Sequence, residues 1–302
     1  MNFSLANMNA TAEDLDYNTT NVFNEYQIIS NYSRSIIFLV TFIICCIGVP
    51  LNGIVIWLLG FQIKRNPFTV LILNLAIADF GFLISMAIYC TNLYIHVIRG
   101  VIPWAIVFSL ANIMYINGLF LLTAISIDRC VAVLFPIWHH CSRPKYLSSV
   151  VCVFLWIFSS ILIGIHYIMQ YLFWNLHLVV TAVLCLPLIT TSAVILFIKI
   201  CLQSQQVKRG RLLVMILITL LCFLILTVPL YIYVFITHFL KKKKFFDVAE
   251  LNFFLCPSAS LNSSVNPMIY FLVGRKKHAQ FRESIKVVFQ RIFREVEASE
   301  SR

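Results

Sequence analysis

The longest uncharged run of the chain covers residues 146–198 and reads YLSSVVCVFLWIFSSILIGIHYIMQYLFWNLHLVVTAVLCLPLITTSAVILFI. One helix needs roughly 20 apolar residues to cross a hydrocarbon core about 30 Å thick, so this run is too long for a single span. Gln170, Trp174, Asn175 and His177 cluster near its middle, as residues at a membrane interface do. The run therefore predicts two membrane helices joined by a tight turn at residues 170–177.

Other uncharged runs of membrane-spanning length lie on both sides of this one. They cover residues 36–63, 67–98 (interrupted only by Asp79), 100–127, 212–240 and 251–274. These apolar runs are continuous and do not alternate with polar residues, which indicates helices rather than barrel strands. The expected fold class is an all-α membrane protein, with a seven-transmembrane helix bundle over residues 35–274.

The composition of the 302-residue chain excludes an ordinary soluble domain. It is 61% hydrophobic and 12% charged, whereas soluble domains carry about 25% charged residues. A net charge of +11 would favour nucleic acid as the partner of a soluble protein. Here the basic residues fall in short segments between apolar runs, so they set orientation in the lipid bilayer, and we expect no nucleic-acid partner.

The two ends of the chain are expected on opposite sides of the plasma membrane. Residues 1–34 contain no apolar leader segment, so the first span is expected to direct insertion. They contain glycosylation sequons at Asn2, Asn9, Asn18 and Asn31, which predict an extracellular glycosylated tail. Most lysines and arginines then lie on the cytoplasmic side, as the positive-inside rule requires.

The last segment, residues 275–302, predicts a cytoplasmic amphipathic helix and a short tail. Apolar residues recur there at helical spacing between arginines and lysines: Phe281, Ile285, Val288, Phe289, Ile292 and Phe293. A basic amphipathic helix of this kind lies in the inner membrane interface.

Polar residues inside membrane spans are costly, so each is a functional hypothesis. They occur here in a fixed order: Asn52 in GVPLNGIVIW, Asp79 in LNLAIADF, Asp128-Arg129-Cys130 ending the third span, then Pro136, Trp156, Pro187, Pro229 and NPMIY at residues 266–270. This order resembles that of a rhodopsin-like (class A) G-protein-coupled receptor over residues 36–293. RNPFTVLILNLAIADF, LLTAISIDRC, LFPIW, RPKY and SSVNPMIYFLVG resemble the Mas and Mas-related receptors more closely.

The resemblance implies roles in G-protein coupling and activation for Asp128, Arg129, Pro136, Ile137, Pro229, Asn266, Pro267 and Tyr270. In such receptors the arginine meets the G protein, and a hydrophobic residue after the proline docks on it. An acid of the sixth span often restrains that arginine, but the matching residue here is Arg209. Asp128 is then the main acidic partner of Arg129, and we expect measurable basal signalling. The alternative is that Asp128 and Arg129 are interfacial charges that only mark the end of a helix.

Two further sets of residues follow from the resemblance. The resemblance implies a polar core of Asn52, Asp79, Asn262, Ser263 and Asn266. It can hold a sodium ion, or it can be a protonated acid with structural hydrogen bonds. Gly118 stands where a hydroxyl is usual. The ligand-pocket candidates are Tyr89, Asn112, Tyr115, His166, Trp174, Asn175, Tyr231, Tyr233 and Asn252, each of which could instead be a core or lipid-facing side chain.

Several features bear on the ligand and on the class of protein. Ala111 stands where amine receptors have an aspartate, and the acids that bind cationic peptides in relatives are absent, so a cationic ligand is less expected. Lys241–Lys244 could attract an anionic ligand or could simply be solvated. The resemblance implies a receptor for an extracellular peptide or small amphiphile that activates a heterotrimeric G protein, and by analogy with relatives the G protein is expected to be of the Gi or Gq class.

Two other classes stay open. A transporter would show internal repeats and several midplane charges, and we find neither. A receptor-like membrane protein that does not signal is the other alternative, because Thr227 replaces a tryptophan and Trp104 a cysteine that most class A receptors carry. We expect no enzyme activity, no metal site and no cofactor, apart from the sodium ion near Asp79.

Overall fold

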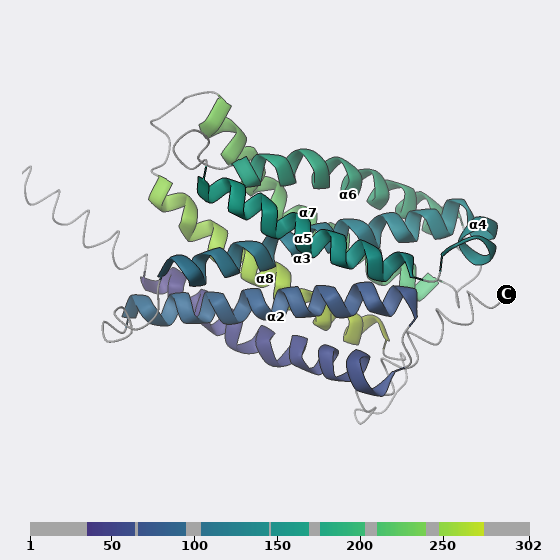
Figure 1. Cartoon of the computed structure of the whole chain (residues 1–302), viewed down its shortest axis with the longest axis horizontal. Helices are drawn as coiled ribbons and strands as arrows, with labels where there is room; N and C mark the ends of the chain where they lie inside the picture. The colour runs from purple at the N-terminus through teal and green to yellow at the C-terminus, as the bar shows by residue number, and fades with distance from the viewer. Residues whose placement is uncertain are drawn as a thin grey trace, which may run out of the picture.

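The computed structural model describes residues 35–63, 66–94, 104–144, 146–168, 176–202, 210–239 and 248–274. In these ranges seven long helices run side by side as one bundle, and none of the described residues is in a strand (Figure 1). The helices are Ser35–Gln62, whose last turn is the π-helix η1 (Leu58–Gln62), then α2 (Pro67–Tyr94), α3 (Trp104–Leu134), α5 (Leu147–Ile168), α6 (Leu176–Leu202), α7 (Gly210–Phe239) and α8 (Val248–Gly274). The predicted all-α seven-helix bundle is confirmed.

The lengths of the helices agree with the apolar runs of the sequence. Five are long and apolar enough to cross a membrane by length and composition: Ser35–Gln62, Pro67–Asn92, Ile106–Leu134, Leu147–His166 and Val179–Leu202. The run at residues 146–198 does form two helices, because α5 ends at Ile168 and α6 begins at Leu176. His177, placed in the turn by the sequence, lies in the first turn of α6.

The third helix packs at the centre of the bundle, against α2, α5, α6 and α7. Its Ile116 and Leu121 are fully buried, as is Phe223 of α7. Side chains on the outer faces remain apolar and exposed, such as Phe154 of α5 and Ile225 of α7. An apolar outer surface of this extent fits a lipid environment, because hydrocarbon requires no polar covering.

The prediction that Asp128-Arg129-Cys130 ends the third span is wrong about the helix. α3 continues through Leu134, so the charged pair lies before its last turn. The helix ends at Leu134, and the backbone of Phe135 (φ −125°, ψ 62°) is not helical, since a residue before proline avoids the α region. Pro136 then begins a short helix, α4 (Pro136–Cys141), which the sequence did not predict.

Several predictions lie outside the described residues. These are the tail with its sequons, the amphipathic helix of residues 275–302, the lysines of residues 241–244, and Arg209, Trp174 and Asn175. Tyr233 lies in α7 and Asn252 in α8, but their side chains are not described. All ten cysteines are described, and none of them forms a disulfide.

Candidate functional site

Asp128 and Arg129 form a buried ion pair at the end of the bundle that carries α4. Arg129 Nη2 lies 2.7 Å from Asp128 Oδ2, and Arg129 Nε donates to the same oxygen at 3.1 Å. The two side chains are only 5% and 11% exposed. Because a buried charge must be paired, this acid is what allows Arg129 to stay inside the bundle.

An aromatic ring of α2 holds the other side of Arg129. The guanidinium carbon lies 3.9 Å from the centre of the Phe68 ring, a cation–π contact worth roughly 2 kcal/mol where water is excluded. Phe68 is positioned by the start of α2, where Asn66 Oδ1 accepts from the Thr69 N–H at 2.7 Å and Thr69 Oγ1 accepts from the Asn66 N–H at 2.8 Å. This reciprocal cap fixes the first turn of the helix.

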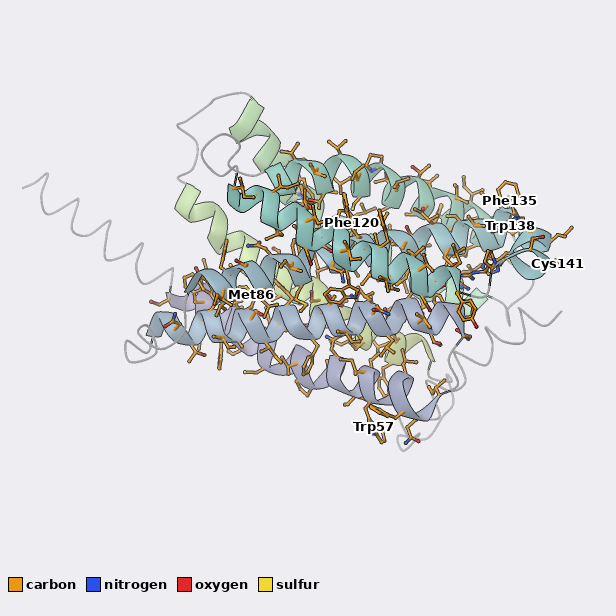
Figure 2. The ribbon with its side chains drawn as sticks, viewed as in Figure 1. Trp57, Met86, Phe120, Phe135, Trp138 and Cys141 are labelled. Carbon is orange, nitrogen blue, oxygen red and sulfur yellow. The ribbon has the colours of Figure 1, made fainter. Side chains whose placement is uncertain are left out.

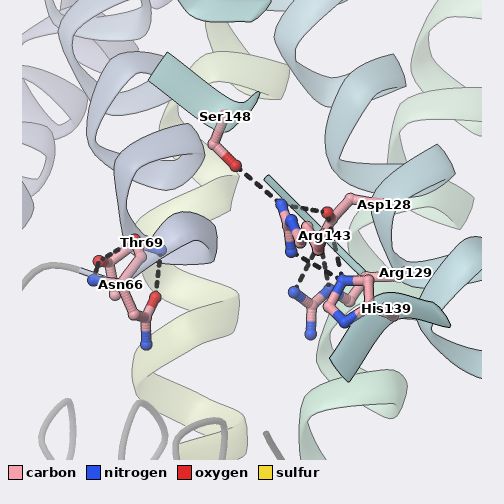
Figure 3. Close-up of polar contacts among 7 residues, drawn as sticks. All are labelled: Asn66, Thr69, Asp128, Arg129, His139, Arg143 and Ser148. Atoms are coloured by element: carbon pink, nitrogen blue, oxygen red, sulfur yellow. Dashed lines mark hydrogen bonds and ion pairs between the residues drawn. The ribbon is translucent and has the colours of Figure 1, made fainter. Parts of the chain in front are cut away.

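Two further side chains meet the same carboxylate, as Figure 3 shows. Arg143 Nη2 lies 2.6 Å from Asp128 Oδ1, and His139 Nε2 lies 3.6 Å from it. We call Asp128, Arg129, His139 and Arg143 the ionic cluster. Sequence reasoning missed His139 and Arg143. The available signal was a histidine and an arginine 11 and 15 positions beyond the acid, across a proline.

The short helix α4 carries exposed apolar side chains beside the ionic cluster. Ile137 is 80% exposed, and Phe135 and Trp138 are also exposed. Figure 2 labels Phe135 and Trp138 at the α4 end of the bundle. Pro136 occupies the first position of α4, where its missing N–H costs no hydrogen bond. Ile137 is therefore free to contact another protein at this end.

The polar core joins α2 to α8 in the middle of the bundle. Asn266 Nδ2 donates to Asp79 Oδ2 at 2.8 Å, and Ser263 is a second hydrogen-bond partner of the same carboxyl group. A methyl group added at Gly118 would lie 3.5 Å from Asp79 Oδ1, so α3 approaches this acid closely but supplies no hydroxyl there. Asp79 is buried, as expected for an acid held by such partners.

Asn52 was predicted in the same core, but its amide makes its hydrogen bonds elsewhere than to Asp79. Its amide donates to the carbonyls of Gly48 and Ser263, both at 3.1 Å, and so joins the first helix to α8. Asn52 Oδ1 is buried without a hydrogen-bond partner. Asn262 is buried nearby in α8. The predicted cluster thus has two parts. In the carboxyl part, Asn266 and Ser263 bind Asp79. In the helix-joining part, Asn52 binds the Ser263 carbonyl.

Proline residues interrupt the two helices that follow α6 in the chain. Pro229 lies inside α7, and Pro267 lies inside α8 next to Asn266. Each removes one backbone hydrogen bond and favours a kink. Tyr270, in the next turn of α8, is buried. These residues stand where the resemblance places a movable part of the bundle.

Sequence reasoning also passed over a bond that joins α2 to α5. Trp156 Nε1 donates to Asn74 Oδ1 at 3.1 Å. The signal was present, because a tryptophan within an apolar span has one N–H donor that needs an acceptor.

Comparisons with known proteins agree with this arrangement. The family of 7 transmembrane receptors (rhodopsin family) matches residues 51–176. The chain is 36% identical over 278 residues to Mas-related G-protein coupled receptor member D of Macaca fascicularis, which covers 83% of this chain and 82% of that protein. It is 35% identical over 258 residues to member A1 of Mus musculus, covering 81% and 84%. Proto-oncogene Mas of Homo sapiens is 33% identical over 265 residues, covering 82% and 80%.

The chain belongs to the Mas-related G-protein-coupled receptors. Membership makes it a multi-pass membrane protein of a receptor family rather than of an enzyme family. Among the described residues, no group of three or more histidines, cysteines or acids could hold a metal ion.

The described pocket candidates of this Mas-related receptor lie on α2, α3, α5 and α7. Tyr231 of α7 meets Thr181 of α6, with 3.2 Å between their hydroxyl oxygens. Tyr115 of α3 packs against Phe82, with ring centres 5.3 Å apart, and lies near Tyr231. These tyrosines lie in the bundle interior, and their role in a ligand pocket stays a prediction.

The other described candidates make contacts of their own, although Tyr89 packs against the same buried cluster as Tyr115. Tyr89 of α2 packs edge-on against Phe38 of the first helix, with ring centres 5.6 Å apart. The Asn112 amide donates to the Phe108 carbonyl of its own helix at 2.9 Å. His166 lies half-buried near the end of α5.

Proposed function

We propose that the chain is a receptor that binds an extracellular peptide or small amphiphile and activates a heterotrimeric G protein. The observation that carries this proposal is the buried Arg129, held by Asp128 and Phe68 at the bundle end where Ile137 is exposed. An arginine buried in this way can contact a partner only after the helices around it move. That requirement describes a two-state switch, in which a ligand favours one arrangement by binding it more tightly.

The interior of the bundle supports a mechanical link between the two ends. Tyr115 and Arg129 both lie on α3, fourteen residues apart along the helix. The Asp79–Asn266 hydrogen bond joins α2 to α8. Pro229 and Pro267 are points at which α7 and α8 can bend. A ligand near Tyr115 and Tyr231 would act on α7, because the Thr181–Tyr231 bond joins that helix to α6.

The proposed orientation has the N-terminus outside the plasma membrane and the C-terminus in the cytoplasm. The sequons before the first helix and the basic residues at the α4 end support it. In this orientation Tyr115 and Tyr231 lie on the ligand side of Arg129, and the ionic cluster lies at the cytoplasmic side.

A sodium ion near Asp79 is a further part of this proposal. Sodium needs several oxygen ligands, and the Asp79 carboxyl group and the Ser263 hydroxyl are the oxygen donors that meet in the carboxyl part of the core. These donor types suit a monovalent cation, which would bring a compensating positive charge into the polar core. The residues themselves hold α2 against α8 with or without the ion.

The test is guanine-nucleotide exchange on purified Gi and Gq heterotrimers, with the receptor in membranes. Exchange is measured without ligand and against panels of peptides and amphiphiles. We expect Arg129→Ala to abolish the receptor-dependent exchange, since it removes the group that meets the G protein. Equal surface expression of both receptors is the control. Exchange that is insensitive to Arg129→Ala would overturn the proposed function.

A further inference from the structure

One arginine, Arg143, joins three helices at the α4 end of the bundle. Its Nη2 lies 2.6 Å from Asp128 Oδ1 of α3 and donates to Ser148 Oγ of α5 at 2.8 Å. Its Nη1 lies 2.7 Å from His139 Nε2 of α4. Figure 3 shows these contacts converging on the Arg143 side chain. A planar guanidinium that makes charged or polar contacts with three elements restricts their relative positions.

The short helix α4 needs such a restraint. It has only six residues, far fewer than the roughly 12–15 that an isolated helix requires. Ile137 and Trp138 are exposed, so these apolar residues do not anchor it to the core. Polar contacts that tie α4 to α3 run through His139 and Arg143. The outward position of Ile137 therefore depends on Arg143.

The same arginine also competes with Arg129 for one carboxylate. Asp128 Oδ2 faces Arg129, and Asp128 Oδ1 faces Arg143 at a slightly shorter distance. An acid shared between two cations holds each less strongly than it would hold one alone. Arg143 thus weakens the restraint on Arg129.

We propose that Arg143 is a positioning residue for G-protein coupling: it fixes α4, and with it Ile137, against α3, and it lowers the hold of Asp128 on Arg129. This inference rests on the proposed function. Arg143 touches neither the proposed ligand region nor, in this role, the G protein itself. It acts through Asp128 and α4.

His139 is the acceptor through which Arg143 holds α4. A guanidinium only donates hydrogen bonds, so His139 Nε2 accepts from Arg143 Nη1. A side chain at position 139 that keeps an acceptor can therefore preserve this contact.

The first arm of the test reads the position of α4 without any G protein. A nitroxide label is placed on the exposed Cys141 of α4, with the other exposed cysteines removed as Cys46→Ser and Cys201→Ser. The label is read in the ligand-free receptor in lipid nanodiscs. We expect Arg143→Gln to mobilise the label, and Ser148→Ala to mobilise it less. We expect His139→Gln, which keeps an acceptor for Arg143, also to mobilise it less than Arg143→Gln does.

The second arm measures coupling with the same variants by guanine-nucleotide exchange. We expect Arg143→Gln to lower exchange about tenfold, as for the loss of a charged hydrogen bond, with Arg143→Lys between that variant and the parent. A label that stays immobile in Arg143→Gln overturns the restraint. A mobile label with unchanged exchange overturns the positioning role.

The Arg129→Ala and Arg143→Gln results together distinguish a failure of the proposed function from a failure of this inference. If Arg129→Ala leaves exchange unchanged, the proposed function is overturned, and the coupling role of Arg143 falls with it. If Arg129→Ala abolishes exchange and Arg143→Gln does not change it, only the inference is overturned.

Discussion

At the scale of single residues, the Asp128 carboxylate pairs with both Arg129 and Arg143. Asparagine at position 128 offers one acceptor oxygen in place of a shared charge. Arg143 has the additional acceptors His139 and Ser148, so it can keep that oxygen and Arg129 loses its ion pair. We therefore expect Asp128→Asn to raise ligand-free nucleotide exchange about fivefold or more, the size of a modest coupling energy. A silent Asp128→Asn receptor that reaches the cell surface would contradict this account.

At the scale of elements, the polar core ties α2 to α8 through Asp79 and Asn266. If sodium binds there, it stabilises the folded bundle by mass action: at ten times its dissociation constant the gain is about 1.4 kcal/mol, or about 2–4 °C in Tm. We expect the parent receptor to melt higher in sodium chloride than in choline chloride at equal ionic strength. Asp79→Asn should melt at the same temperature in both salts. A parent receptor without this difference would show that the core holds the helices without an ion.

At the scale of the whole molecule, the fold is a bundle whose termini are expected on opposite sides of a membrane. We expect glycosidase treatment of intact cells to reduce the apparent mass of the receptor. The shift should disappear when Asn2, Asn9, Asn18 and Asn31 are all replaced by glutamine. Asn262 also lies in a sequon but is buried within α8, so Asn262→Gln is the matched control and should leave the shift unchanged. A tail that antibodies reach only after permeabilisation would reverse the orientation.

Much of the architecture follows from the sequence because a bilayer restricts it. A helix must be apolar over the hydrocarbon thickness, so the uncharged runs located the seven helices and, apart from the end of α3, placed their described ends within a few residues. Residues 146–198 resolved into two helices for that reason. The end of α3 was misplaced because the prediction set it at the charged residues. The helix in fact continues until Pro136 disfavours a helical backbone at the residue before it.

The partners of the polar residues were decided by tertiary structure. The sequence determined that Asp79, Asp128 and Arg129 are costly residues that need partners, since hydrocarbon cannot solvate them. It did not determine that Asn52 contacts the Ser263 carbonyl, or that Arg143 and His139 share Asp128 with Arg129. Those contacts depend on how helices distant in sequence pack and on how α4 turns back after Pro136. Only the folded bundle brings these atoms within a few ångströms of each other.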